Sequence, residues 1–161
     1  FNNSKMTEGA FQEGWYHTGD LLKKDESGNY FFVDRKNDLI RYKGRSVSSV
    51  AIESTVNQHI KIESSAAFGI ESKELWSEHE IMLTVVLKEG HSMEAKEVAE
   101  YIFKNAPHFF VPRYIEFLSE LPMTPTNKIM KNRLMDFLKL CVHMMISLQI
   151  KIHLRLLRIV S

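Results

Sequence analysis

The sequence predicts a small α+β domain in which helices pack on a sheet of about three strands. Two observations support this fold class. Short aromatic and β-branched runs alternate with helix-like segments, and the links between them are short. In addition, a hydrophobic content of 44% is ample for a packed core in a chain of 161 residues, which can hold one domain of ordinary size and a tail.

Strand-like runs recur along the chain, and the one at residues 81–87 is the strongest because of its β-branched content. Residues 1–29 are rich in Gly, Asn, Asp, Ser and Glu, and turn dipeptides such as Glu13-Gly14 interrupt them. The five runs predicted as strands cover residues 30–33, 39–42, 65–70, 81–87 and 114–118.

Three segments have helical features. In the first, Ser48 or Ser49 is the expected N-cap, and Glu53 lies early in the helix, where the macrodipole favours an acid. The second begins at residue 92 or 93 and places its apolar residues on one side. The predicted helices cover about residues 50–59, 92–104 and 132–140.

The last stretch, residues 138–161, has a different composition. It is free of acidic residues, and residues 148–155 alternate apolar with polar side chains, although flanking apolar pairs spoil this strand period. It is too basic for a transmembrane helix. A membrane-surface helix, an added edge strand, and a frame-shifted or read-through end of a broken gene are the three explanations, and we favour the last.

Composition excludes several classes of function. A net charge of +1, from 21 basic and 20 acidic residues, creates no global field that would select a partner. The single cysteine, Cys141, excludes an intramolecular disulfide and a cysteine-rich zinc site, and it fits a reducing, cytoplasmic location. The histidines are scattered, so no protein-bound metal is expected. No aromatic residue follows His143 for base stacking, so the tail is not expected to bind nucleic acid. Membrane contact by the tail is not expected either.

Three segments carry the candidate chemistry. Residues 121–131, LPMTPTNKIMK, place Lys128 on a turn that should be exposed, because proline and asparagine break regular structure. Far upstream lie residues 14–20, GWYHTGD, and residues 33–44, VDRKNDLIRYKG. Together, in this order and at this separation, the segments resemble the adenylate-forming acyl-CoA synthetase superfamily. They are most similar to its carnitine/crotonobetaine-CoA ligase and fatty-acyl-CoA ligase branch.

The resemblance covers residues 1–137 and implies a division into domains. Residues 1–34 are the β-rich end of a large N-terminal AMP-binding domain, residues 35–137 are a mobile C-terminal cap, and residues 138–161 are the tail. The phosphate-binding loop and the acyl pocket of the family belong to the large domain, which is missing. The chain has no Met at position 1 and looks cut from a longer protein, so it is expected to be incomplete and inactive alone.

The resemblance implies a nucleotide site around the Thr18-Gly19-Asp20 tripeptide. Asp20 matches the aspartate that accepts hydrogen bonds from both ribose hydroxyls, a task that suits an acceptor-only carboxylate. Thr18 belongs to the same site. The alternative is an ordinary turn, but the preceding residues 14–16 favour the ribose role.

The junction between the two domains carries the next matches. Arg35 corresponds to the arginine that contacts the ribose or phosphate of the nucleotide, and the alternative is a surface ion pair with Asp34 or Asp38. Asn37 falls at the hinge about which the cap rotates, where the family usually has an aspartate or a lysine. Asparagine tolerates unusual backbone angles, which is compatible with a hinge.

Gly44 matches a glycine that lets the backbone approach the CoA pantetheine channel, although a simple turn glycine is an equal alternative. Many relatives have two glycines here, whereas this chain has Lys43 in the first place. Glu53 matches a glutamate with a structural role.

Lys128 matches the catalytic lysine, whose ammonium bridges the substrate carboxylate and the α-phosphate as adenylation proceeds. The residue before it is usually glycine and is Asn127 here.

The implied activity is an AMP-forming acid–CoA ligase that uses ATP, Mg²⁺ brought by ATP, CoA and a small or fatty carboxylic acid. Lys128 serves acyl-adenylate formation, and the cap then rotates about Asn37 to present the Gly44 face for thioester formation. The alternative is a stand-alone, cap-like binding module without catalysis of its own.

Overall fold

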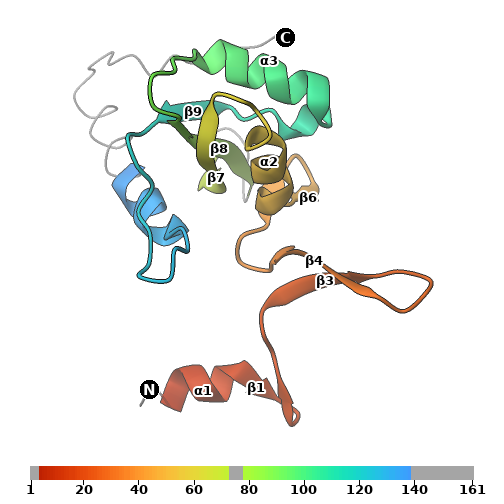
Figure 1. Ribbon diagram of the computed structural model, residues 1–161. Helices are drawn as coiled ribbons and strands as arrows, with labels where there is room; N and C mark the ends of the chain where they lie inside the picture. The colour runs from red at the N-terminus through yellow and green to blue at the C-terminus, as the bar shows by residue number, and fades with distance from the viewer. Residues whose placement is uncertain (1–3, 73–77, 139–161) are drawn as a thin grey trace.

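The computed structural model describes residues 4–72 and 78–138, and its centre is a three-stranded sheet (Figure 1). In the sheet, β7 and β8 pair antiparallel, whereas β8 and β9 pair parallel. A parallel pair needs a crossover connection, which α3 supplies. The predicted fold class, a sheet of about three strands with packed helices, is confirmed. The elements are β7 (Ile62–Glu71), β8 (His79–Leu87), α3 (Ala95–Asn105), a short 3₁₀ turn η1 (His108–Phe110) and β9 (Tyr114–Phe117).

Helices cover both faces of this sheet. The helix α2 (Ser49–Val56) and α3 pack on one face, and the helical residues 131–138 pack on the other. Since side chains alternate along a strand, β8 contributes to both layers and reads as an almost continuous apolar run. The first layer centres on Ile52, Val56, Ile81, Leu83, Val85, Val98 and Ile102, and the second on Phe68, Met82, Val86, Leu121, Leu134 and Leu138.

Residues 4–35 form an arm that extends away from the sheet (Figure 1). Within the arm, β1 pairs with β2 and β3 pairs with β4, both antiparallel, so the predicted β-rich piece is present. The next hairpin, β5 with β6, belongs to the core domain (residues 40–138), because Ile40 and Val47 are each only 1% exposed within it. The elements are α1 (Ser4–Ala10), β1 (Phe11–Gln12), β2 (Trp15–Tyr16), β3 (Asp20–Lys24), β4 (Tyr30–Arg35), β5 (Ile40–Tyr42) and β6 (Arg45–Val47).

Element boundaries differ from the predictions in a few places. Helix α3 begins at Ala95 rather than at residue 92 or 93, because Glu94 and Glu97 form a reciprocal capping box there. Ser48 is the N-cap of α2, as expected, but the first turn of that helix holds no acid. The expectation for Glu53 was therefore wrong, and its carboxylate has a different partner. The predictions for residues 139–161 concern a segment outside the described residues.

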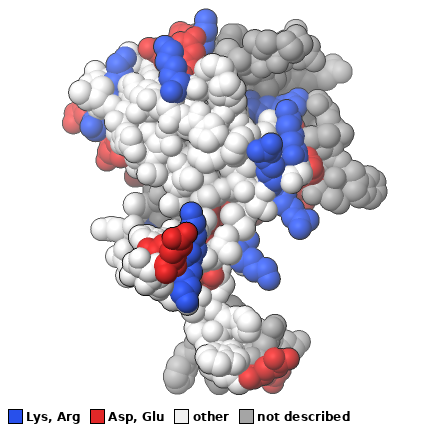
Figure 2. Space-filling model, turned by 90° about the vertical axis from the view of Figure 1, so that its right-hand side faces the viewer, with Lys and Arg blue, Asp and Glu red and all other residues white. Residues whose placement is uncertain are grey.

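Charges on the surface are mixed. On the face shown in Figure 2, several Lys and Arg side chains gather in one group on the core domain, basic and acidic side chains are mixed elsewhere, and the end of the arm carries an acidic group. In the part of the chain that the structure describes, no helix is long and apolar enough to cross a membrane.

Candidate functional site

The two residues expected at the nucleotide face each other across the β3–β4 hairpin. Asp20 and Arg35 are directly paired in the strand register, and the Arg35 Nε lies 3.7 Å from the Asp20 Oδ1. The Thr18 hydroxyl accepts the Asp20 backbone N–H at 3.1 Å, which holds the tight turn that precedes β3. Arg35 therefore does make an ion pair, but with Asp20 rather than with Asp34 or Asp38. Both side chains remain accessible, at 33% for Asp20 and 63% for Arg35.

The proposed hinge residue lies in a tight turn directly after β4. The Arg35 carbonyl accepts the N–H groups of Asp38 at 3.0 Å and of Leu39 at 3.2 Å, and these bonds close the turn. Asn37 lies at the middle of the turn and is exposed. Asn37 is not among the described non-glycine residues with positive φ. A short, exposed turn between the arm and the core domain is a suitable place for rotation.

Gly44 lies in the turn of the β5–β6 hairpin. The turn needs a left-handed backbone, with φ of 48° at Lys43 and 73° at Gly44, which matches the two-residue turns that suit a twisted hairpin. Both N–H groups donate to one carboxylate, that of Glu78, at 2.8 and 2.7 Å. Glycine at this position is explained by the backbone angle, because a Cβ there would meet nothing within 4 Å.

Lys128 is exposed in a closed loop. The Thr124 N–H donates to the Lys128 carbonyl at 2.8 Å, and the Thr124 hydroxyl accepts the Lys128 N–H at 3.0 Å. Asn127 has a φ of 56°, a left-handed conformation that asparagine tolerates better than most residues. This explains how asparagine can stand where the family usually has glycine.

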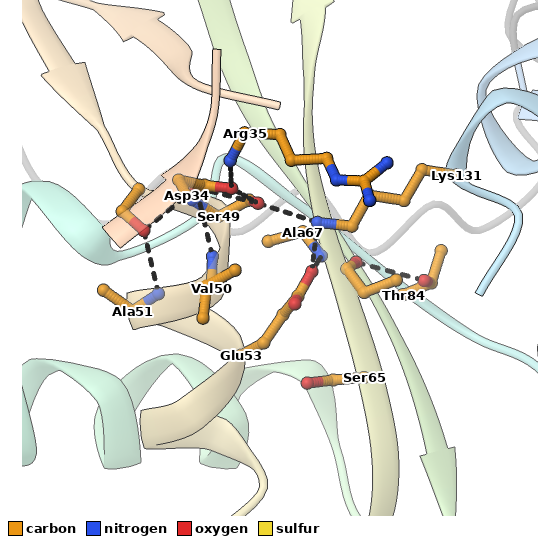
Figure 3. Close-up of polar contacts among 12 residues, drawn as sticks. Asp34, Arg35, Ser49, Val50, Ala51, Glu53, Ser65, Ala67, Thr84 and Lys131 are labelled. Atoms are coloured by element: carbon orange, nitrogen blue, oxygen red, sulfur yellow. Dashed lines mark hydrogen bonds and ion pairs between the residues drawn. The ribbon is translucent and has the colours of Figure 1, made fainter. Parts of the chain in front are cut away.

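A buried polar network, which sequence reasoning did not identify, lies beside these elements (Figure 3). Asp34, at the end of β4, is fully buried and accepts the backbone N–H of Ser49 at 2.6 Å, the Ser48 hydroxyl at 2.9 Å and the Arg35 N–H at 2.8 Å. A carboxylate at a helix N-terminus satisfies unpaired N–H groups and interacts favourably with the macrodipole. Asp34 therefore ties the end of the arm to α2.

The network continues through Lys131 to the sheet (Figure 3). The Lys131 ammonium donates to the Ser49 hydroxyl at 2.7 Å and lies 2.7 Å from the Glu53 carboxylate. The Ser49 hydroxyl in turn donates to Asp34 at 3.1 Å, and Glu53 accepts the Ala67 N–H of β7 at 2.8 Å. The side chains of Lys131 and Glu53 are only 15% and 14% exposed. Burial raises the pKa of Glu53, and the nearby Lys131 ammonium opposes that rise.

One sequence signal could have indicated this network. Asp34 is a charged residue directly after the aromatic and β-branched run of β4. Further along the chain, two consecutive serines, Ser48 and Ser49, stand at a helix start. Buried charges need partners, but no local pattern joins Asp34 to Lys131, which is distant in sequence.

The structure brings together only part of the predicted site. Asp20 and Arg35 are adjacent on the arm, with Thr18 supporting Asp20. The loop of residues 121–130 and the β5–β6 hairpin, which carry Lys128 and Gly44, lie at opposite sides of the core domain in Figure 1. The core domain thus presents two separate faces.

The core domain, a small α+β fold with an exposed lysine loop, can be assigned to a class of protein. Residues 51–128 match the family model of the AMP-binding enzyme C-terminal domain. The core domain is therefore a C-terminal domain of the adenylate-forming, AMP-binding enzymes, as the sequence predicted.

The relatives indicate the branch of this family. The chain is 36% identical over 131 residues to the crotonobetaine/carnitine–CoA ligase of Salmonella paratyphi C (strain RKS4594), a match that covers 81% of this chain and 25% of the relative. The chain thus spans about a quarter of the length of the curated relatives that it matches.

Solved structures of adenylate-forming enzymes also match the fold of this chain. The o-succinylbenzoate CoA synthetase (MenE) of Bacillus subtilis, in complex with its acyl-adenylate intermediate, matches with a TM-score of 0.74 and 28% identity, covering 83% of this chain and 27% of that one. The ATP-bound MatB of Rhodopseudomonas palustris matches with a TM-score of 0.75 and 25% identity, over 84% of this chain and 27% of that one.

Proposed function

We propose that this chain is the C-terminal part of an AMP-forming acid–CoA ligase and supplies its mobile cap and its catalytic lysine. The observation that carries the proposal is the exposed Lys128 at a closed, left-handed turn of an AMP-binding C-terminal domain. The substrates are ATP with Mg²⁺, CoA and a small or fatty carboxylic acid.

The chemistry of the first half-reaction explains the need for a lysine. The attacking carboxylate and the α-phosphate are both anions, and they repel each other as the new bond forms. A flexible ammonium that touches both groups lowers that repulsion, and an exposed loop lets it reach a site on another domain. Acyl-adenylate and pyrophosphate are the products.

The arm binds the nucleotide in this proposal. Asp20 accepts hydrogen bonds from the ribose hydroxyls, Arg35 donates to the ribose or phosphate, and Thr18 holds Asp20 in place. The ion pair between Asp20 and Arg35 supports this assignment, because it brings an acceptor and a permanent cation to one edge of a hairpin.

Two faces of the cap serve the two half-reactions. The Lys128 loop serves adenylation, and rotation about Asn37 then brings the Gly44 turn to the site, where the CoA thiol attacks the acyl-adenylate. The positions of the two segments at opposite sides of the core domain support this alternation (Figure 1).

In this proposal the arm contacts the large AMP-binding domain, and residues 1–34 are the last piece of that domain. Supporting this, among the residues that the structure describes, most of the exposed large apolar side chains lie on the arm. An exposed apolar patch marks an interaction surface in soluble proteins. This observation favours a part of a larger ligase over a stand-alone binding module. The residues are Phe11, Trp15, Tyr16, Leu21, Leu22, Tyr30, Phe31 and Phe32, each at least 43% exposed.

A chimera tests the proposal. Residues 1–138 would replace the matching C-terminal quarter of the Salmonella ligase, and two rates would be measured: acid-dependent ATP–pyrophosphate exchange, and thioester formation from supplied acyl-adenylate. The chimera should perform both. Lys128→Ala should lower the exchange rate by about 10²- to 10³-fold, the size of effect seen when one transition-state donor is removed, and should leave thioester formation largely intact.

Lys104→Ala, an exposed lysine in the last turn of α3, is the matched control and should change neither rate. Equal losses in both half-reactions, or an unchanged exchange rate, would contradict the role of Lys128. A folded chimera that performs neither reaction would contradict the proposed function as a whole.

A further inference from the structure

The Lys128 loop is internally closed, so the position of Lys128 depends on how the base of the loop is held. Besides the bonds between Thr124 and Lys128, the Met130 N–H donates to the Pro122 carbonyl at 2.8 Å, and Met123 forms a bridge with Ile129. A loop closed by several backbone bonds moves as one unit.

The base of the loop leads directly into helical residues 131–138, and two kinds of contact hold that segment. Leu134 and Leu138 pack on the sheet, with exposures of 3% and 5%. Apolar contacts are not directional, so they permit rotation or sliding of a helix. Lys131 adds charge-assisted hydrogen bonds to Ser49 and Glu53, both at 2.7 Å, and such bonds fix distance and direction.

The far end of the same network reaches the arm. Ser49 donates to Asp34, and the Asp34 carboxylate also accepts the backbone N–H of Arg35. Arg35 begins the turn that contains Asn37. A continuous chain of bonds therefore connects the base of the Lys128 loop with the residue proposed to bind the nucleotide (Figure 3).

We propose that Lys131 is a positioning residue that fixes the Lys128 loop relative to α2 and to the end of the arm. The inference rests on the proposed function, because it assigns Lys131 to the half-reaction that uses Lys128. Lys131 does not touch the reacting groups: its ammonium is taken by Glu53 and Ser49, and its side chain is only 15% exposed. Its removal leaves the loop attached but poorly aligned.

The test uses the chimera described above with three variants. Lys131→Met keeps the length of the side chain and removes the charge, Lys131→Arg keeps the charge, and Arg133→Met is the matched control on the same helical segment, where Arg133 is exposed. Lys131→Met should lower kcat of acid-dependent pyrophosphate exchange by about 100-fold, the scale of a misplacement of about 1 Å, with a nearly unchanged KM for ATP. Thioester formation from supplied acyl-adenylate should persist, Lys131→Arg should recover most of the rate, and Arg133→Met should have no effect.

A purely structural role makes different predictions. The double variant Lys131→Met with Glu53→Gln removes both charges of the Lys131–Glu53 ion pair, so it should recover thermal stability. Under the positioning proposal its exchange rate stays low, because the directional link to Ser49 is still absent. Recovery of exchange together with stability, or equal losses in the two half-reactions, would overturn the positioning role. If Lys128→Ala lowers exchange but Lys131→Met does not, only the inference about Lys131 fails. If Lys128→Ala has no effect, the proposed function fails and takes the inference with it.

Discussion

Removal of the Lys131 ammonium should destabilise the chain far more than removal of a surface lysine. Lys131→Met leaves the Glu53 carboxylate, which is 14% exposed, with the Ala67 N–H as its remaining partner in the network. Breaking a buried pair by deleting one partner costs about 3–5 kcal/mol, and the partial exposure of both side chains places the expected loss near about 3 kcal/mol. For a domain of this size, that loss lowers Tm on the order of 10 °C.

The loss should depend on pH. Glu53 already has a pKa raised by burial, and without Lys131 that pKa rises further. A carboxyl group with a raised folded-state pKa contributes stability that is present below its unfolded pKa and is lost as pH rises through the folded pKa. The difference between parent and variant should therefore be small near about pH 4 and largest near about pH 7.

Urea unfolding followed by circular dichroism would measure these differences, with Lys96→Met as the control. Lys96 pairs with Glu100 on the surface of α3, where the side chains are 64% and 50% exposed. Such an exposed pair contributes only about 0.3–0.5 kcal/mol. If Lys131→Met lowered the unfolding free energy no more than Lys96→Met, or lost the same amount at both pH values, the account of a buried ion pair would be refuted.

Three further predictions concern other parts of the chain. Asn127→Val should cost about 1–2 kcal/mol in urea unfolding, because a β-branched residue does not suit the φ of 56°, whereas Asn127→Gly should cost little. Asp34→Asn should cost about 2 kcal/mol, because the bonds that cap α2 lose their charge; a loss below about 0.5 kcal/mol would contradict this. Burial raises the pKa of Glu116. The contribution of this carboxyl group to the free energy of unfolding is therefore fully present below about pH 4.5 and falls as pH rises through the folded-state pKa. Glu116→Gln should thus gain stability relative to the parent near about pH 7 but not near about pH 4, and an equal difference at both would be the contrary result.

Much of the fold could be predicted from local patterns. The β-branched run of β8 and the serine at the start of α2 carry their structural information within a few residues, and both predictions agree with the structure. The two-residue strands β1 and β2 could not be predicted, because so short a pair has no period to recognise. The expectation that Glu53 would serve the start of α2 was wrong for a related reason. The role of this residue is set by its contacts with the sheet and with Lys131, and not by its place in the helix.

The sequence by itself determined the family, the β-rich piece ahead of a small α+β domain, and the exposed turn that carries Lys128, because each depends on neighbouring residues or on motifs in order along the chain. Only the tertiary structure decided that Arg35 pairs with Asp20, and that Asp34, Ser49, Glu53 and Lys131 share one buried network. These contacts join strands β3 and β4, helix α2 and the helical residues 131–138, which are far apart in sequence. Charges buried at such a junction must find partners wherever the fold places them, and no local pattern records which partners those are.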